Sequence, residues 1–213
     1  MARIYFYKLT ADTGGAPCVE GGLLSLAICK PMIRGSVTEG DLIFGFAANS
    51  LHRDNRLIYA ARVTQTLRNG DYYRSKRFAE RGDCIYKFRS GHFVWRRDAL
   101  HHGPKHVAHD LGDYPDYPRA NVLLSTDFRY FGRAGTDEYK SVFPMVRNAV
   151  ERLGQGQRVH HDLALHDQLL KMANWVWQRT RSKVAGSPTS APSPRTCYRG
   201  KSCGVVYLRG NPR

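Results

Sequence analysis

Two apolar segments joined by a polar loop constrain the fold of this chain most strongly. Residues 42–48 (LIFGFAA) and 57–67 (LIYAARVTQTL) are rich in β-branched and aromatic residues, and the loop at 49–56 has the composition of a hairpin connection. The pattern predicts an antiparallel pair of strands in a small barrel or sheet. Gly45, inside the first strand, indicates a bulge or a close approach of another group to the backbone.

The remaining sequence predicts more strands and then two helices. Alternating or apolar runs favour short strands at 3–9, 84–88, 92–96 and 121–132. A first helix is expected from near Ser141, with Pro144 in its opening turn. A second is expected from about 161 to 183, with Leu163, Leu170, Ala173 and Trp177 on one face.

The composition changes at residue 186, where GSPTSAPSP begins. Proline and small polar residues cannot bury enough surface to fold, and the segment after them is short and basic. We therefore expect one domain at 1–185, followed by a mobile linker and tail at 186–213.

The chain carries 33 Lys or Arg against 18 Asp or Glu, a net charge of +15. Residues 186–213 contribute five of the basic residues and no acid, so residues 1–185 keep a net charge of +10. A basic body attracts polyanions by releasing their counterions. A basic surface without a dedicated partner is the alternative interpretation.

The sequence favours a cytoplasmic protein that does not contact a membrane. Its first 30 residues have no signal-peptide pattern, and no apolar run approaches the length of a membrane span. Five cysteines at irregular spacing argue against a disulfide framework.

Four histidines lie within ten residues in the segment HHGPKHVAHD, at 101, 102, 106 and 109. The spacing of His102 and His106 would suit a zinc site on a helix, but Gly103 and Pro104 break such a helix. The chain also lacks a phosphate-binding P-loop and a dinucleotide fingerprint. We therefore expect no metal and no cofactor.

Cys29 permits two interpretations. It follows Leu-Ala-Ile, which is the usual setting of a buried thiol in a hydrophobic core. Lys30 and Arg34 lie close to it in sequence, and positive charge beside a thiol favours a nucleophilic role instead.

Aromatic residues interleaved with Lys and Arg are frequent at 72–97 and 128–131. This arrangement suits nucleic acid, because bases stack on rings while cations hold phosphates. About half of these rings are expected in the core of a β-rich domain.

Several motifs together resemble a known family over about residues 1–150. The motifs are DTGGAPC (12–18), LLSLAICKPMIR (23–34), GDLIFGF (40–46), RLIYAARVT (56–64), GDCIYKF (82–88), the pair at 101–102 and VLLSTDFRYFG (122–132). Their order and spacing are similar to the nucleotide-modification-associated domain family of the second type. That resemblance implies a bacterial or phage protein linked to modified DNA bases. By fold-level analogy it also implies a PUA-like core, hence an α+β fold with a small mixed β-barrel flanked by helices.

The resemblance also points to residues for a site. It implies Asp12 and Cys29 as catalytic candidates, and as ligand contacts Asp12, Gly14, Ala16, Pro17, Lys30, Pro31, Arg34, Asp127 and Tyr130, beside Phe131 and Gly132. Glycines let backbone amides approach a ligand, and the cations can bind phosphate. We add Lys8, Asn49 and Ser50 as ligand-binding candidates.

Three functions remain open from the sequence. The first is a reader that binds DNA or a nucleotide and recognises a modified or flipped base. The second is an enzyme that transfers or removes a group on a nucleotide or modified base, using Asp12 with Cys29 or Lys30. The third is an adaptor with a protein partner in a phage or defence system, which would expose an apolar patch around Trp175 and Trp177.

Overall fold

The computed structural model describes residues 2–154 and 156–190. Its central element is a five-stranded sheet with the order β10-β5-β4-β1-β11. The sheet is made of β1 (Ile4–Leu9), β4 (Leu42–Ala47), β5 (Leu57–Arg62), β10 (Asp127–Tyr130) and β11 (Gln157–Arg158). Strands β1 and β4 are parallel, and the other neighbours are antiparallel.

Two smaller sheets complete the β structure. The four-stranded sheet, in the order β2-β3-β9-β6, consists of β2 (Cys18–Glu20), β3 (Leu23–Leu26), β6 (Gln65–Leu67) and β9 (Val122–Ser125). A separate hairpin pairs β7 (Tyr86–Arg89) with β8 (His92–Trp95). The expected α+β class is confirmed. The expected PUA-like barrel is not confirmed, because the described strands form three separate sheets and none closes into a barrel.

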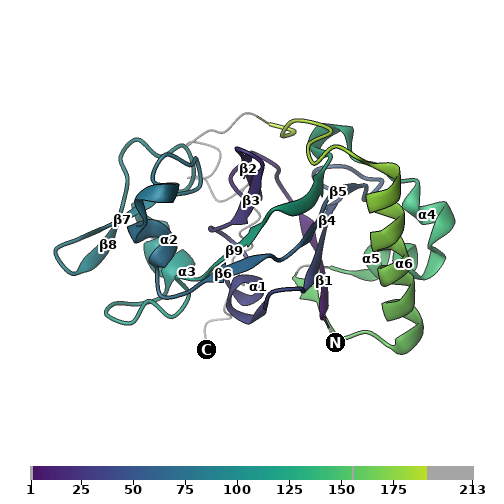
Figure 1. Cartoon of the computed structure of the whole chain (residues 1–213), viewed down its shortest axis with the longest axis horizontal. Helices are drawn as coiled ribbons and strands as arrows, with labels where there is room; N and C mark the ends of the chain where they lie inside the picture. The colour runs from purple at the N-terminus through teal and green to yellow at the C-terminus, as the bar shows by residue number, and fades with distance from the viewer. Residues whose placement is uncertain (1, 155, 191–213) are drawn as a thin grey trace, which may run out of the picture.

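Within residues 2–154 and 156–190, six α-helices flank the sheets: α1 (Pro31–Ser36), α2 (Asp71–Arg74), α3 (Val107–Leu111), α4 (Tyr139–Val142), α5 (Pro144–Arg152) and α6 (Leu163–Arg179). In Figure 1, α4, α5 and α6 lie on the right, against one face of the five-stranded sheet, and α2 and α3 lie on the left with the β7-β8 hairpin. None of the described helices is long and apolar enough to span a membrane.

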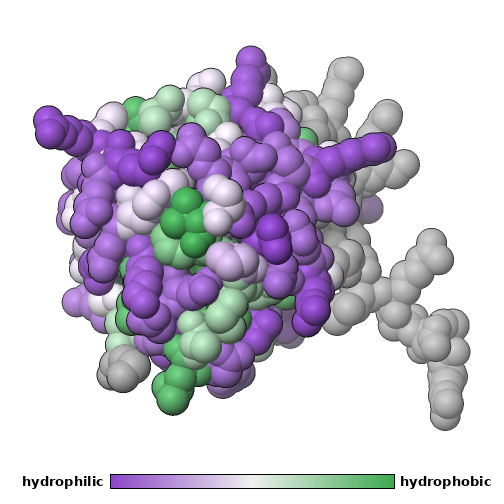
Figure 2. All heavy atoms as spheres, turned by 90° about the vertical axis from the view of Figure 1, so that its right-hand side faces the viewer, coloured by the Kyte–Doolittle hydropathy of each residue, from purple (hydrophilic) through white to green (hydrophobic). Residues whose placement is uncertain are grey.

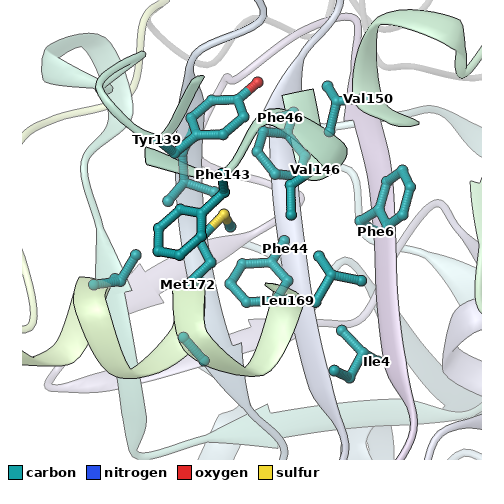
Figure 3. Packing of buried hydrophobic residues seen from close by; sticks show 14 of the residues in the cluster. Ile4, Phe6, Phe44, Phe46, Tyr139, Phe143, Val146, Val150, Leu169 and Met172 are labelled. Atoms are coloured by element: carbon teal, nitrogen blue, oxygen red, sulfur yellow. The ribbon is translucent and has the colours of Figure 1, made fainter. Parts of the chain in front are cut away.

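One core fills the space between the five-stranded sheet and the helices. Phe6, Phe44 and Phe46 extend from the sheet toward Val146 of α5 and Leu169 of α6 (Figure 3). Phe44 and Phe46 are fully buried there. These two rings therefore belong to the core and do not line a base pocket.

The predicted strand pair at 42–67 is confirmed, and so is the irregularity at Gly45. Strands β4 and β5 are antiparallel, with a register shift between Gly45 and Phe46. The Tyr59 ring lies against the Gly45 backbone, where a Cβ would be 2.2 Å from a ring carbon.

A Gly45→Ala variant is expected to lower the free energy of unfolding by about 1–3 kcal/mol, because the added methyl overpacks a buried site. Urea denaturation followed by circular dichroism measures the change. Gly154→Ala is the control, since nothing lies within 4 Å of the Cβ that it adds. Equal stability of the two variants would contradict the expected clash.

The helical region differs in detail from the sequence prediction. The expected single helix from Ser141 is two helices, because Phe143 precedes proline and leaves the helical conformation at φ −125° and ψ 73°. Helix α6 begins after its N-cap Asp162. Ala173 is buried as expected, but the other buried residues differ from the expected ones and are Leu165, Leu169, Met172 and Val176. Leu163 is 88% exposed.

The C-terminal segment at 183–190 lies against the body. The Tyr130 N–H donates to the Lys183 carbonyl, and the Ala185 N–H donates to the Tyr130 carbonyl. The Ser190 N–H donates to the Asp12 carbonyl. The first five residues of the predicted linker are therefore packed on the domain, and the rest of the predicted tail lies outside the described residues.

Candidate active site

Cys29 occupies a sharp turn between β3 and α1. Cys29 and Lys30 both have left-handed backbone conformations, with φ of 58° and 42°, and Pro31 then begins the helix. Such a conformation costs a non-glycine residue about 1–2 kcal/mol. Strained residues of this kind concentrate at functional sites, where surrounding contacts hold them in place.

The thiol of Cys29 lies beside an imidazole that is oriented by a carboxylate. Cys29 Sγ is 3.3 Å from His102 Nε2, and His102 Nδ1 is 2.5 Å from Asp110 Oδ2. All three side chains are buried. A nucleophile, a base and a group that orients the base define a catalytic triad, which is recognised by geometry.

The Asp110 carboxylate has donors on both oxygens. Besides His102, the Tyr86 hydroxyl donates to Oδ2 at 2.6 Å. The Cys29 N–H donates to Oδ1 at 3.1 Å, and His109 Nδ1 lies 3.2 Å from the same atom. Asp110 therefore fixes both the base and the backbone of the nucleophile.

Electrostatics favour a charged His102 and an ionised Asp110. Burial alone would lower the pKa of His102, but the charges of Cys29 and Asp110 and its hydrogen bonds to both raise that pKa well above its usual value. Burial likewise opposes ionisation of Asp110, yet the charge and hydrogen bond of His102, the hydrogen bond of His109 and the charge of Arg34 hold the pKa of Asp110 well below its usual range.

The buried side chain of Arg34 links the backbone at Cys29 to the backbone at Asp110. Its guanidinium is fully buried and donates to four backbone carbonyls, those of Cys29, Asp110, Arg119 and Asn121. The sequence predicts Arg34 as a ligand contact, but these carbonyls occupy its donors. Its position makes it a structural support of the turn.

Residues 11–16 and 101–102 border the cleft that leads to the Cys29 thiol. A narrow cleft of about 10 Å³ is lined by Cys29 and His102 together with Ala11, Thr13, Gly15, Ala16, Ile28 and His101. Thr13 and His101 also line a larger neighbouring cavity of about 370 Å³. The triad therefore lies where the cleft meets the protein interior.

Some of the residues expected in the first loop lie at these openings. Ala16 lines the narrow cleft, and Gly14, Pro17 and Tyr130 line the larger cavity. The DTGGAPC motif therefore forms a wall of the candidate site.

Asp12 has a different role from the expected base. Its carboxylate accepts the Tyr130 hydroxyl at 2.8 Å and the N–H and hydroxyl of Thr189 at 3.2 and 3.3 Å. Burial raises the pKa of Asp12, although these hydrogen bonds lower it in part. The contacts make Asp12 the attachment point of the C-terminal segment.

An Asp12→Ala variant is expected to loosen that segment, because the buried hydroxyl of Tyr130 and the amide of Thr189 lose their acceptor. Hydrogen exchange read by mass spectrometry should show faster exchange of the peptide containing Thr189, by about tenfold or more for a lost contact of about 1–3 kcal/mol. Asp137→Ala, at an exposed position, is the control. Unchanged exchange would contradict this role of Asp12.

The other expected ligand contacts lie away from the triad's openings. Lys8 is on the helix-facing side of β1, with Phe6, and Asn49 and Ser50 are exposed in the loop after β4. The Asp127 carboxylate accepts the indole N–H of Trp177. Pro31 starts α1, and the ammonium group of Lys30 lies 4.8 Å from the Tyr7 ring centre.

The interleaved aromatic residues are mostly core. Tyr72, Tyr73, Tyr86 and Phe93 are buried in one cluster beneath the β7-β8 hairpin. Phe88 is 40% exposed, with the Arg74 guanidinium 4.3 Å from its ring centre. The rings of this region therefore stabilise the fold and do not form an open base-stacking surface.

The face of α4, α5 and α6 is largely hydrophilic, with a small apolar area, in Figure 2. Trp175 and Trp177 are only partly buried but pack against the core. The large apolar side chains that are exposed on these helices are Val142, Met145, Leu163 and Leu170. Among the residues that the structure describes, no group of three or more His, Cys, Asp or Glu side chains could hold a metal ion.

Sequence reasoning missed His102, Asp110 and Tyr86 as members of the site. The only available signal was the His101-His102 pair among the family-like motifs. A family model described as nucleotide modification associated domain 2 matches residues 1–194, which include the whole triad and extend beyond the 1–150 resemblance. No curated protein and no solved structure matches the chain.

Proposed function

The chain belongs to the nucleotide modification associated domain 2 family, and from this membership and its triad we propose that it is a cysteine-dependent enzyme. Family membership links the chain to nucleotide or DNA modification in general. We propose that the enzyme removes or transfers an acyl-type group carried by a nucleotide or a modified base. The observation that carries this proposal is the contact of Cys29 Sγ with His102 Nε2, 3.3 Å apart.

The geometry supports a two-step acyl transfer. His102 takes the proton of the Cys29 thiol, and Sγ forms a bond to the carbonyl carbon of the group. The bond between that carbon and the nitrogen or oxygen of the base breaks, and the leaving atom receives the proton from His102. Water, with His102 as base, then attacks the thioester carbon; the bond between that carbon and Sγ breaks, the acyl group leaves as a carboxylic acid, and Sγ receives its proton from His102.

One further observation supports a nucleotide or DNA substrate, and another separates the enzyme from the reader. The net charge of +10 on residues 1–185 favours association with phosphates. The buried aromatic rings and the blocked donors of Arg34 give less support to a reader that stacks bases on an aromatic surface. The second of the functions left open by the sequence is therefore the better supported.

The test uses an oligonucleotide that contains N4-acetylcytosine and the same oligonucleotide without the acetyl group. Wild-type protein should remove the acetyl group, as seen by mass spectrometry of nucleosides after nuclease digestion. Cys29→Ser should leave it in place. An acid-quenched digest should contain an acetyl thioester on the Cys29 peptide, whereas removal of the group by Cys29→Ser at the wild-type rate would contradict the proposal.

A further inference from the structure

The larger cavity beside the triad has the size and lining of a ligand site. Its volume of about 370 Å³ lies within the usual range for small-molecule pockets. Thr13 and His101 line both this cavity and the narrow cleft that contains Cys29. A group held in the cavity is therefore adjacent to the thiol.

His101, which lines both spaces, has a buried ring nitrogen with no hydrogen-bond partner among the described residues. The residue is 3% exposed, and its Nδ1 atom has no hydrogen-bond partner in the described structure. Gly15 packs on the ring so closely that a Cβ there would lie 2.8 Å from Nδ1. A buried nitrogen without a partner costs free energy unless something bonds to it.

The cavity has no positive charge among its described lining residues. Val19, Leu100, Val184 and Pro188 supply apolar surface, and Glu20 supplies a carboxylate. Burial and the neighbouring charge of His102 lower the pKa of His101 to about 4, so its ring is neutral near pH 7. Phosphate is normally bound by Arg, Lys or clustered backbone amides. This lining therefore selects against a phosphate group.

We propose that the cavity binds the uncharged ring part of the substrate, a nucleobase or nucleoside, with His101 Nδ1 as a hydrogen-bond partner and with any phosphate left outside. This inference rests on the proposed function, because it places the ring so that its acyl substituent reaches Cys29. Residues 184–188, which form part of the wall, are then part of the binding site.

The test measures binding, using the Cys29→Ala variant so that no turnover interferes. The probes are the four 2′-deoxynucleosides and their 5′-monophosphates, titrated by calorimetry. At least one nucleoside should bind. Its 5′-monophosphate should bind with an affinity at most about threefold higher than that of the nucleoside. Adding His101→Phe should weaken nucleoside binding about tenfold, the loss expected for one hydrogen bond.

A second substitution, Val19→Trp, fills the cavity and should weaken binding by more than about tenfold, because the indole occupies the space of the ligand. Val142→Trp is its matched control: Val142 is 49% exposed on α4, and the same substitution there should leave binding unchanged. Thermal melting of each variant checks that it is folded.

Monophosphates that bind more than about tenfold tighter than nucleosides would overturn the inference. So would nucleoside binding that Val19→Trp leaves intact, or no binding of any probe. These failures differ from failure of the proposed function, which appears as a Cys29→Ser variant that retains deacylation. Deacylation that depends on Cys29 without nucleoside binding in the cavity would leave the function standing and remove this inference alone.

Discussion

Replacing His102 with Ala is expected to slow alkylation of Cys29 by iodoacetamide by about 10²-fold or more, within the range that a positioned base contributes. In the wild type, His102 Nε2 is the group 3.3 Å from the thiol that accepts its proton. Without His102, the imidazole that would stabilise the reactive thiolate form of Cys29 is missing. Peptide mapping by mass spectrometry at timed intervals measures the rate for Cys29.

The matched control is His109→Ala. His109 also contacts the Asp110 carboxylate, at 3.2 Å, but about a third of its side chain is exposed. The His109→Ala variant should be alkylated at Cys29 at a rate within about a few-fold of that of the wild type. Cys18 and Cys84 are internal references, because burial raises the pKa of both thiols, that of Cys84 to about 12. Equal rates in the two histidine variants would refute the role given to His102.

The second large effect concerns stability. Asp110→Asn is expected to lower the free energy of unfolding by about 3–5 kcal/mol, because it leaves one member of a buried charged pair without its partner. The amide also keeps only one acceptor oxygen, so its NH2 group faces either the Cys29 N–H or the Tyr86 hydroxyl, both of which donate to Asp110. Chemical denaturation measures the loss. Asp98→Asn, at an exposed ion pair with Arg96, is the control and should change stability little.

The loss should depend on pH in a defined direction. The pKa of Asp110 is depressed in the folded state, so its contribution is present above the unfolded value of about 3.9 and is lost as pH falls through the folded value. The pKa of His102 is raised, so its contribution is fully present below about 6.5 and is lost as pH rises through the folded value. The difference between wild type and Asp110→Asn should therefore be largest between about pH 4 and 6.5. A flat difference from pH 3 to 8 would contradict the pairing.

The strands could be predicted from the sequence because their signal is local. Alternation at 3–9 and the apolar runs at 42–48 and 57–67 each contain the information that makes them strands. The expected barrel was not found among the described strands, because closure depends on how distant strands pair, and this cannot be inferred from local patterns. The buried face of α6 was missed for a related reason: the N-cap at Asp162 sets which residues point inward, and several stripes of apolar residues were compatible with a helix.

The triad could not be predicted because its members are distant in sequence. His102 and Asp110 lie 73 and 81 residues beyond Cys29, and only the complete tertiary structure brings them together. The apolar context of Cys29 did predict that it is buried, and the residue is 2% exposed. Burial and reactivity are compatible here, because a narrow cleft reaches the thiol. The charge of Arg34 suggested that it binds a ligand, whereas its guanidinium donates to four backbone carbonyls instead.

Arg34 gives the site a dependence on complete folding. Its guanidinium holds the carbonyls of Cys29 and Asp110 together with those of Arg119 and Asn121. The left-handed turn at Cys29 is bonded to Arg34 and to the Asp110 carboxylate, and Arg34 in turn bonds carbonyls that lie 85 and 87 residues after it in the chain. A chain synthesised only as far as residue 100 lacks these partners. We therefore expect the arrangement around Cys29 to form only after the chain has reached Asn121.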